Sequence, residues 1–138
     1  MAKAAGIHNV TDVIRGTFII DRPEQADAII QELAKRFEVV AEDWKVTALN
    51  YADRTLNVRL PSGMVGEILI MDAAMAAASE AGHALKVEGR NLARALEADP
   101  GNAELTARLE DVYARSRNLY GKVLASYPPE WREAFGLD

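Results

Sequence analysis

Two carboxylates, Glu67 and Asp12, lie in or next to apolar runs that are typical of β-strands. Glu67 lies inside the apolar run VGEILI, and Asp12 precedes the β-rich run VIRGTFII. A carboxylate within an apolar strand is costly unless it is exposed, paired or bound to a metal. Together on one face of a sheet, these two carboxylates would hold Mg²⁺ and the phosphate chain of a nucleotide. The alternative is that Asp12 caps or ends a loop and that Glu67 pairs with Arg59 or Arg15.

Several aromatic and basic residues are candidates for binding the base or the phosphates of a nucleotide. Tyr51 could stack on a base, although a Tyr at the entry of a strand more often packs over a turn. Lys86, Arg90 and Arg94 recur every four residues, a spacing that aligns them on one side of a helix. That stripe could meet phosphates, but a solvated face is the favoured interpretation. His83 stands among Ala and Leu, where packing or exposure is the usual role of a helical His.

The stretch from residue 50 to residue 70 predicts two strands joined by a tight turn. Pro61-Ser62-Gly63 suits a three-residue loop in which the Gly takes the left-handed position. In this register Leu60 faces Met64, and Asn57 faces Glu67. One face of the hairpin is then apolar, with Leu56, Val58, Leu60, Met64, Gly66, Ile68 and Ile70. The other face is mostly polar, with Thr55, Asn57, Arg59, Val65, Glu67 and Leu69.

The rest of the chain predicts one strand, one helix and another strand before the hairpin, and helices after it. The ranges are a strand at 13–20, a helix from 24 to about 37, a strand at 38–47, helices at 72–97 and 102–126, and a short helix after Pro128-Pro129. Gly82 and Gly89 suit close contact between helices. Strict alternation in the first strand puts Asp12 on the buried side, so it reaches the polar face only past a strand end or a bulge.

This order of elements predicts an α+β fold. We expect a mainly antiparallel sheet of about four strands (β-α-β-β-β), with helices covering one of its faces and a C-terminal helical hairpin. The chain would form a single domain, residues 1–138. Residues 1–70 would supply the sheet and first helix, and residues 71–138 the helical C-terminal part.

Composition narrows the classes of function. The 138 residues are 49% hydrophobic, enough for one ordinary core, and the net charge of −5 argues against binding to duplex nucleic acid. The absence of cysteine excludes disulfides and favours a reducing, cytoplasmic setting. Two histidines argue against zinc, which leaves Mg²⁺ with oxygen ligands as the expected metal. No stretch of the sequence suggests a signal peptide or a membrane span.

Two runs resemble the synthetase domain of RelA/SpoT-like proteins, namely TDVIRGTFII and NYADRTLNVRLPSGMVGEILI. Within that family, the resemblance is strongest to phage-encoded and toxin-type members. Gly82, His83 and Leu85 match a helix motif of the same domains, so the resemblance covers about residues 9–90. It implies a Mg²⁺-dependent pyrophosphokinase that transfers pyrophosphate from ATP to the ribose hydroxyl of a guanine or adenine nucleotide. Asp12 and Glu67 would be its catalytic metal ligands. The substrate-binding residues that it implies are Arg15, Lys45, Tyr51, Asp53, Asn57, Arg59 and His83.

The chain also departs from the pattern of this family. The departures are Asn50 for Gly, Ala52 for Arg, Leu69 for Gln, Lys86 for Tyr and Thr17 for Arg. The eleven residues before Asp12 do not include the helical segment with Lys, Ser and Arg that grips ATP in the family. The resemblance therefore supports the fold more strongly than the activity.

Two functions follow as hypotheses. The first is the pyrophosphokinase, with ATP and a nucleotide acceptor as its partners. The second is a catalytically inactive relative that binds a nucleotide or a protein, or serves as a structural module, as part of a phage or toxin protein. Its long Ala-bearing helix would suit a protein partner or a second copy of the chain.

Overall fold

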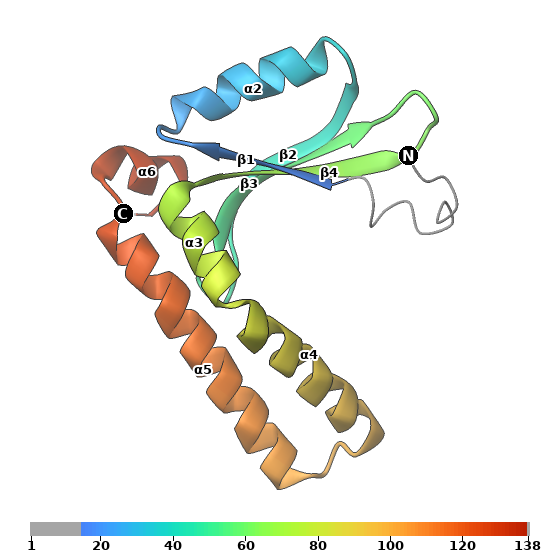
Figure 1. Cartoon of the computed structure of the whole chain (residues 1–138), viewed down its shortest axis with the longest axis vertical. Coiled ribbons are helices and arrows are strands. Elements are labelled where there is room, and N and C mark those ends of the chain that lie inside the picture. Colours follow the sequence, from blue (N-terminus) through green and yellow to red (C-terminus); the bar gives the residue numbers. More distant parts are fainter. Residues whose placement is uncertain (1–14, 138) are drawn as a thin grey trace.

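A computed structural model describes residues 15–137 and, for Arg15, the backbone alone. Asp12 lies outside these residues. Four strands and five helices are described, in an order that agrees with the predicted one (Figure 1). They are β1 (Arg15–Ile20), α2 (Glu24–Ala34), β2 (Glu38–Val46), β3 (Ala52–Arg59), β4 (Val65–Asp72), α3 (Ala73–Ala81), α4 (His83–Ala98), α5 (Ala103–Ser126) and α6 (Pro129–Ala134). None of the helices within residues 15–137 is long and apolar enough to cross a membrane.

The four strands form one mixed sheet in the order β1-β4-β3-β2. The pairs β2–β3 and β3–β4 are antiparallel, whereas β1 runs parallel to β4 at the edge. A parallel pair needs a long connection, which α2, β2 and β3 provide here. The predicted α+β fold with a mainly antiparallel sheet is confirmed.

The β3–β4 hairpin has the predicted register. Asn57 faces Glu67, and the Leu60 N–H donates to the Met64 carbonyl at 2.7 Å. Gly63 has φ of 94°, the left-handed conformation that a residue with a Cβ rarely adopts. Its N–H donates to the Leu60 carbonyl at 2.8 Å and closes the loop. The composition of the loop therefore fixes which side chains of both strands share a face.

The apolar face of the sheet carries the core and is covered by α2. Leu56 and Ile70 are fully buried there, together with Ala26 and Ile30 of the helix. At one end of this face the Arg54 guanidinium donates to Asp27 of α2 at 3.1 Å and to Glu42 of β2 at 2.9 Å. A cation thus ties the covering helix to two strands of the sheet.

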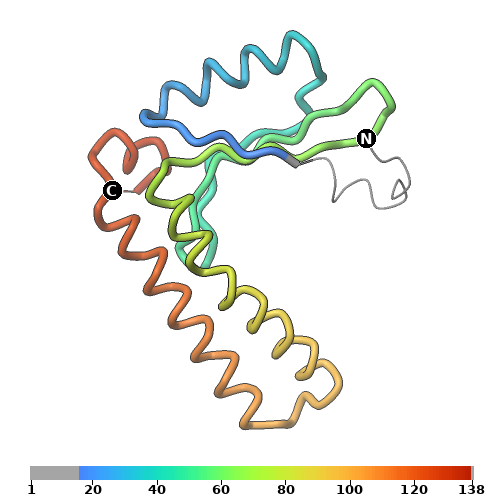
Figure 2. The backbone as a smooth tube through the Cα atoms, viewed as in Figure 1, coloured from blue at the N-terminus to red at the C-terminus, as the bar shows by residue number. Residues whose placement is uncertain are grey.

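The opposite, polar face of the sheet is covered as well. Figure 1 shows α2 on one side of the sheet and α3, α4 and α5 on the other. Asp53 and Thr55, which point to this second side, are 1% and 9% exposed. The expectation that helices cover one face is therefore wrong, because the helices after β4 return across the polar face. Figure 2 shows α4 and α5 continuing beyond the sheet side by side as a helical hairpin.

The helix predicted over residues 72–97 is divided into α3 and α4 at Gly82. A Cβ on Gly82 would lie 2.8 Å from Tyr120 Oη and 2.9 Å from Leu119 Cδ2, so the ends of two α5 side chains lie against this glycine. The expected close contact at Gly89 is also present, with 3.4 Å between a Cβ there and Val112 Cγ1. The prediction of one continuous helix over residues 72–97 was wrong. The glycines indicate close contacts between helices, but they do not indicate that the helix is interrupted at Gly82.

The last two helices end the chain as predicted. Asn102 caps α5, since its Oδ1 accepts from the Leu105 N–H at 3.1 Å. After the Pro128-Pro129 break, α6 places Trp131 against the sheet, where it is 3% exposed and meets Trp44 edge-on at 6.3 Å. The Tyr127 hydroxyl donates to Asp72 at 2.6 Å and links this segment to the end of β4.

Candidate functional site

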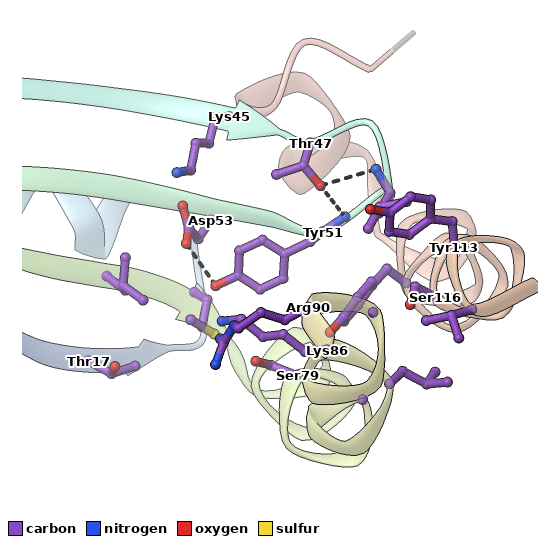
Figure 3. Close-up of a pocket in the computed structure, with 18 of the residues that line it drawn as sticks. Thr17, Lys45, Thr47, Tyr51, Asp53, Ser79, Lys86, Arg90, Tyr113 and Ser116 are labelled. Atoms are coloured by element: carbon purple, nitrogen blue, oxygen red, sulfur yellow. Dashed lines mark hydrogen bonds between the residues drawn. The ribbon is translucent and has the colours of Figure 1, made fainter. Parts of the chain in front are cut away.

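A cavity of about 640 Å³ lies between the polar face of the sheet and helices α3, α4 and α5 (Figure 3). Its volume falls within the range of about 300–1,000 Å³ typical of small-molecule sites. The sheet contributes Lys45, Asp53 and Glu67 to its lining, and the loop before β3 contributes Tyr51. The helices add basic side chains and hydroxyls. The side of the hairpin predicted to carry chemistry is therefore the floor of a cavity.

Hydrogen bonds fix Tyr51 and Asp53 on this floor. The Tyr51 hydroxyl donates to Asp53 Oδ2 at 2.8 Å, and the Thr55 hydroxyl donates to Asp53 Oδ1 at 2.7 Å. Both carboxylate oxygens of Asp53 thus accept a hydrogen bond, which a carboxylate with 1% exposure requires. The rings of Tyr51 and Tyr120 also pack in a T-shaped arrangement, with centroids 5.5 Å apart. Asp53 therefore serves to hold Tyr51 in place.

The environment of Tyr51 keeps its hydroxyl protonated. Burial, the hydrogen bond to Asp53 and the negative charges of Asp53 and Glu67 all raise the pKa of Tyr51 well above its ordinary value. Burial raises the pKa of Tyr120 too. Neither phenol can act as a base near neutral pH, so both serve this cavity as neutral hydrogen-bonding groups.

The turn between β2 and β3 sets the position of Tyr51. Thr47 Oγ1 accepts from the N–H groups of Leu49 at 3.3 Å and of Tyr51 at 3.2 Å. Asn50 has φ of 69°, and its side chain donates to the Arg117 carbonyl of α5 at 3.1 Å. The left-handed conformation is uncommon outside Gly but favours Asn among the other residues. The Asn that departs from the family pattern therefore fits the turn and ties it to α5.

Three cationic side chains line the cavity. Lys45 comes from β2, and Lys86 and Arg90 come from consecutive turns of α4. Figure 3 shows the last two pointing from the helix toward the sheet. Arg94, the third member of the predicted stripe, is not among the lining residues. The spacing of four residues indicated that the three basic residues share one side of a helix. Only the tertiary structure shows that Lys86 and Arg90 face a cavity.

Glu67 is the candidate metal ligand that the structure describes at this site. It is partly buried and lines the cavity, whereas its predicted partner Asp12 lies outside residues 15–137. Within the described part of the chain, no group of three or more His, Cys, Asp or Glu side chains could hold a metal ion. Mg²⁺ commonly uses one or two carboxylates and completes its coordination with phosphate and water oxygens. Glu67, as a carboxylate that lines the cavity, fits that mode of binding.

The other predicted site residues are spread over the molecule. Arg15 pairs with Glu67 in the β1–β4 register through the backbone. Asn57 faces Glu67 across the hairpin but does not line the cavity. Arg59 pairs with Glu38 at 3.4 Å and donates to the Gly63 carbonyl at 3.2 Å.

His83 begins α4, is exposed and does not line the cavity. The cavity therefore unites Lys45, Tyr51, Asp53 and Glu67 from the predicted set, and Asn57, Arg59 and His83 lie outside it. Sequence reasoning did not place Ser79, Ser116 or Tyr120 at the site, since single hydroxyls on helices give no periodic signal.

No protein-family model and no curated protein matches the chain. Among solved structures, a GTP pyrophosphokinase family protein from Streptococcus pneumoniae is similar with a TM-score of 0.46 and 15% identity, over 89% of this chain and 63% of that one. Small alarmone synthetase 1 from Bacillus subtilis, alone and bound to its product pppGpp, gives a TM-score of 0.43 and 18% identity, over 85% of this chain and 64% of that one.

The chain thus spans less than two thirds of the length of these proteins. TM-scores below 0.5 at such low identity assign neither a family nor an activity. The function of the chain has to be inferred from the residues of its cavity.

Proposed function

We propose that the cavity binds a nucleotide and that its phosphates lie against Lys45, Lys86 and Arg90. The observation behind this proposal is that the three cations and Glu67 line one cavity together with two phenols whose pKa values are raised. Guanidinium and ammonium groups form charge-assisted hydrogen bonds with phosphate oxygens. Aromatic rings and apolar side chains nearby suit a nucleoside.

In its finer form, the proposal is a Mg²⁺-dependent pyrophosphokinase that transfers pyrophosphate from ATP to the ribose hydroxyl of an acceptor nucleotide. This form rests on the resemblance of the two sequence runs to RelA/SpoT-like synthetases. Glu67, with Asp12, would hold the metal ion, which neutralises the charge that develops on the transferred phosphates. The three cations, which are exposed residues at the lining of the cavity, would orient the phosphate chain.

The second candidate function is nucleotide binding without catalysis. Asp53 and Glu67 are the carboxylates among the described lining residues, and Asp53 is occupied by Tyr51 and Thr55. Glu67 would then have to serve both the metal and the acceptor hydroxyl, unless Asp12 shares the task. Among residues 15–137, the cavity lining therefore has fewer carboxylates than the transfer reaction needs, which favours nucleotide binding without catalysis.

Release of AMP separates the two candidates. The chain is incubated with ATP, Mg²⁺ and either GDP or GTP, and AMP is quantified by chromatography. For the enzyme, AMP forms only with an acceptor present, and Glu67→Gln abolishes it while the thermal midpoint changes little. Nucleotide binding without AMP would instead establish the binding module. Loss of stability in Glu67→Gln without a change in turnover would make Glu67 a structural residue.

A further inference from the structure

Ser116 carries a hydroxyl that opens to the cavity and has no hydrogen-bond partner among the described residues. Its side chain lines the cavity from α5 and is 6% exposed. No hydrogen bond joins this hydroxyl to any residue in the described range 15–137. A helical Ser can bond to the carbonyl one turn earlier, as Ser126 does with a nearby carbonyl at 2.8 Å, but Ser116 does not. A hydroxyl that faces a cavity from a largely buried side chain and has no partner in the protein is available to a ligand.

The walls around Ser116 are apolar. Leu85, Gly89 and Ala93 of α4 line the cavity together with Val112 of α5. The two helices are close at this level, because a Cβ on Gly89 would touch Val112 at 3.4 Å. The two helices are therefore in contact at this level, and the apolar part of the cavity lies beside this contact, with the hydroxyls of Ser116 and Tyr113 also in its lining.

The cations occupy a different part of the same cavity. In Figure 3, Ser116 lies beside Tyr113 on the α5 side, while Lys86 and Arg90 point from α4 toward the sheet. A ligand that uses both parts must be anionic at one end, and flat or apolar with a polar edge at the other. A nucleotide has this division, with phosphates at one end and a base at the other.

We propose that Ser116 recognises the edge of the base of the bound nucleotide, with the base lying in the cavity against α4 and α5. This inference rests on the proposed nucleotide binding and adds the orientation of the ligand. A hydroxyl can both donate and accept, so Ser116 can meet a carbonyl, an amine or a ring nitrogen on the base edge. Tyr51 then acts as a fixed wall of the cavity, since its hydroxyl donates to Asp53 and its ring packs against that of Tyr120.

The test compares Ser116→Ala with Ser126→Ala, the same change on the same helix at an exposed serine. Each variant is titrated by calorimetry with GDP, ATP and inorganic pyrophosphate in the presence of Mg²⁺. Pyrophosphate carries the phosphate charge but no base. We expect Ser116→Ala to weaken GDP or ATP binding by about tenfold, the effect of one hydrogen bond, and to leave pyrophosphate binding unchanged. Ser126→Ala should alter none of the three affinities.

Two results would overturn the role of Ser116 while leaving the proposed function intact. One is an unchanged nucleotide affinity in Ser116→Ala. The other is an equal loss of affinity for pyrophosphate, which would place the residue at the phosphates or in the general packing. A failure of the unmodified chain to bind either nucleotide would instead overturn the proposed function itself. Thermal unfolding of Ser116→Ala should match that of the unmodified chain, because no bond within the protein is lost.

Discussion

The Tyr51 hydroxyl and the Asp53 carboxylate are joined by a hydrogen bond of 2.8 Å at the floor of the cavity. The second oxygen of the carboxylate accepts from Thr55 at 2.7 Å. A carboxylate buried to this degree is stable only while both bonds persist. The pair therefore belongs to the framework of the site, and its removal should be felt in the stability of the whole domain.

Tyr51→Phe should lower the free energy of unfolding by about 1.5–3 kcal/mol, because it leaves a buried carboxylate oxygen without a donor. The change keeps the ring and its contact with Tyr120. Urea denaturation followed by circular dichroism measures the difference. Tyr113→Phe is the matched control, since its hydroxyl makes no hydrogen bond within the described residues. Equal effects of the two substitutions would show that the Asp53 hydrogen bond adds nothing.

The pKa of Tyr51 also predicts a pH dependence. Its folded-state pKa is raised above the ordinary value of about 10, as is that of Tyr127, which donates to Asp72. The contribution of these protonated phenols to the free energy of unfolding is fully present below pH 10, about the pKa of an ordinary Tyr. Above it the phenols of the unfolded chain ionise first, so stability is lost as the pH rises toward the folded pKa. Urea midpoints measured between pH 8 and 11 should fall less steeply for Tyr51→Phe than for the unmodified chain, and parallel curves would contradict this cause.

Gly82→Ala tests the bend between α3 and α4. The added Cβ would meet Tyr120 Oη at 2.8 Å and Leu119 Cδ2 at 2.9 Å, so the α5 side chains must shift. We expect a loss of about 1–3 kcal/mol in the free energy of unfolding, typical of overpacking. Gly101→Ala is the control, because nothing lies within 4 Å of a Cβ at that position. Should both variants unfold at the same urea concentration, the contact of Leu119 and Tyr120 with Gly82 would contribute nothing to stability.

Arg90→Gln tests the contribution of α4 to phosphate binding. Loss of a charge-assisted hydrogen bond should weaken nucleotide binding by about 10- to 100-fold and reduce its dependence on salt. Arg94→Gln makes the same change one turn later, outside the cavity lining, and should change the affinity less than about twofold. Calorimetric titrations with GDP at two salt concentrations measure both effects. Comparable losses in the two variants would mean that general charge attraction, not the cavity, determines binding.

The hairpin could be predicted in detail because its loop and its alternation restrict the register. Gly63 and the pairing of Asn57 with Glu67 follow from local composition. The parallel pairing of β1 with β4 could not be predicted, since it joins segments whose local patterns carry no information on each other. The same holds for the break at Gly82, which depends on Leu119 and Tyr120 of a later helix.

The candidate site was predictable in its sheet half only. Alternation along the hairpin puts Glu67 on the polar face, the resemblance adds Lys45 and Asp53, and the structure unites the three in the cavity. The helical half was missed because a stripe containing Lys86 and Arg90 looks the same in sequence whether it faces solvent or a cavity. Ser116 leaves no pattern at all, since its significance lies in burial without a hydrogen-bond partner among the described residues.

The most direct test of the central claim is a calorimetric titration of the unmodified chain with GDP and with ATP in the presence of Mg²⁺. The account predicts saturable binding of at least one nucleotide at one site per chain, with affinity lost in Arg90→Gln and retained in Arg94→Gln. Absence of binding heat for both nucleotides, in a sample whose circular dichroism shows the folded protein, would contradict it.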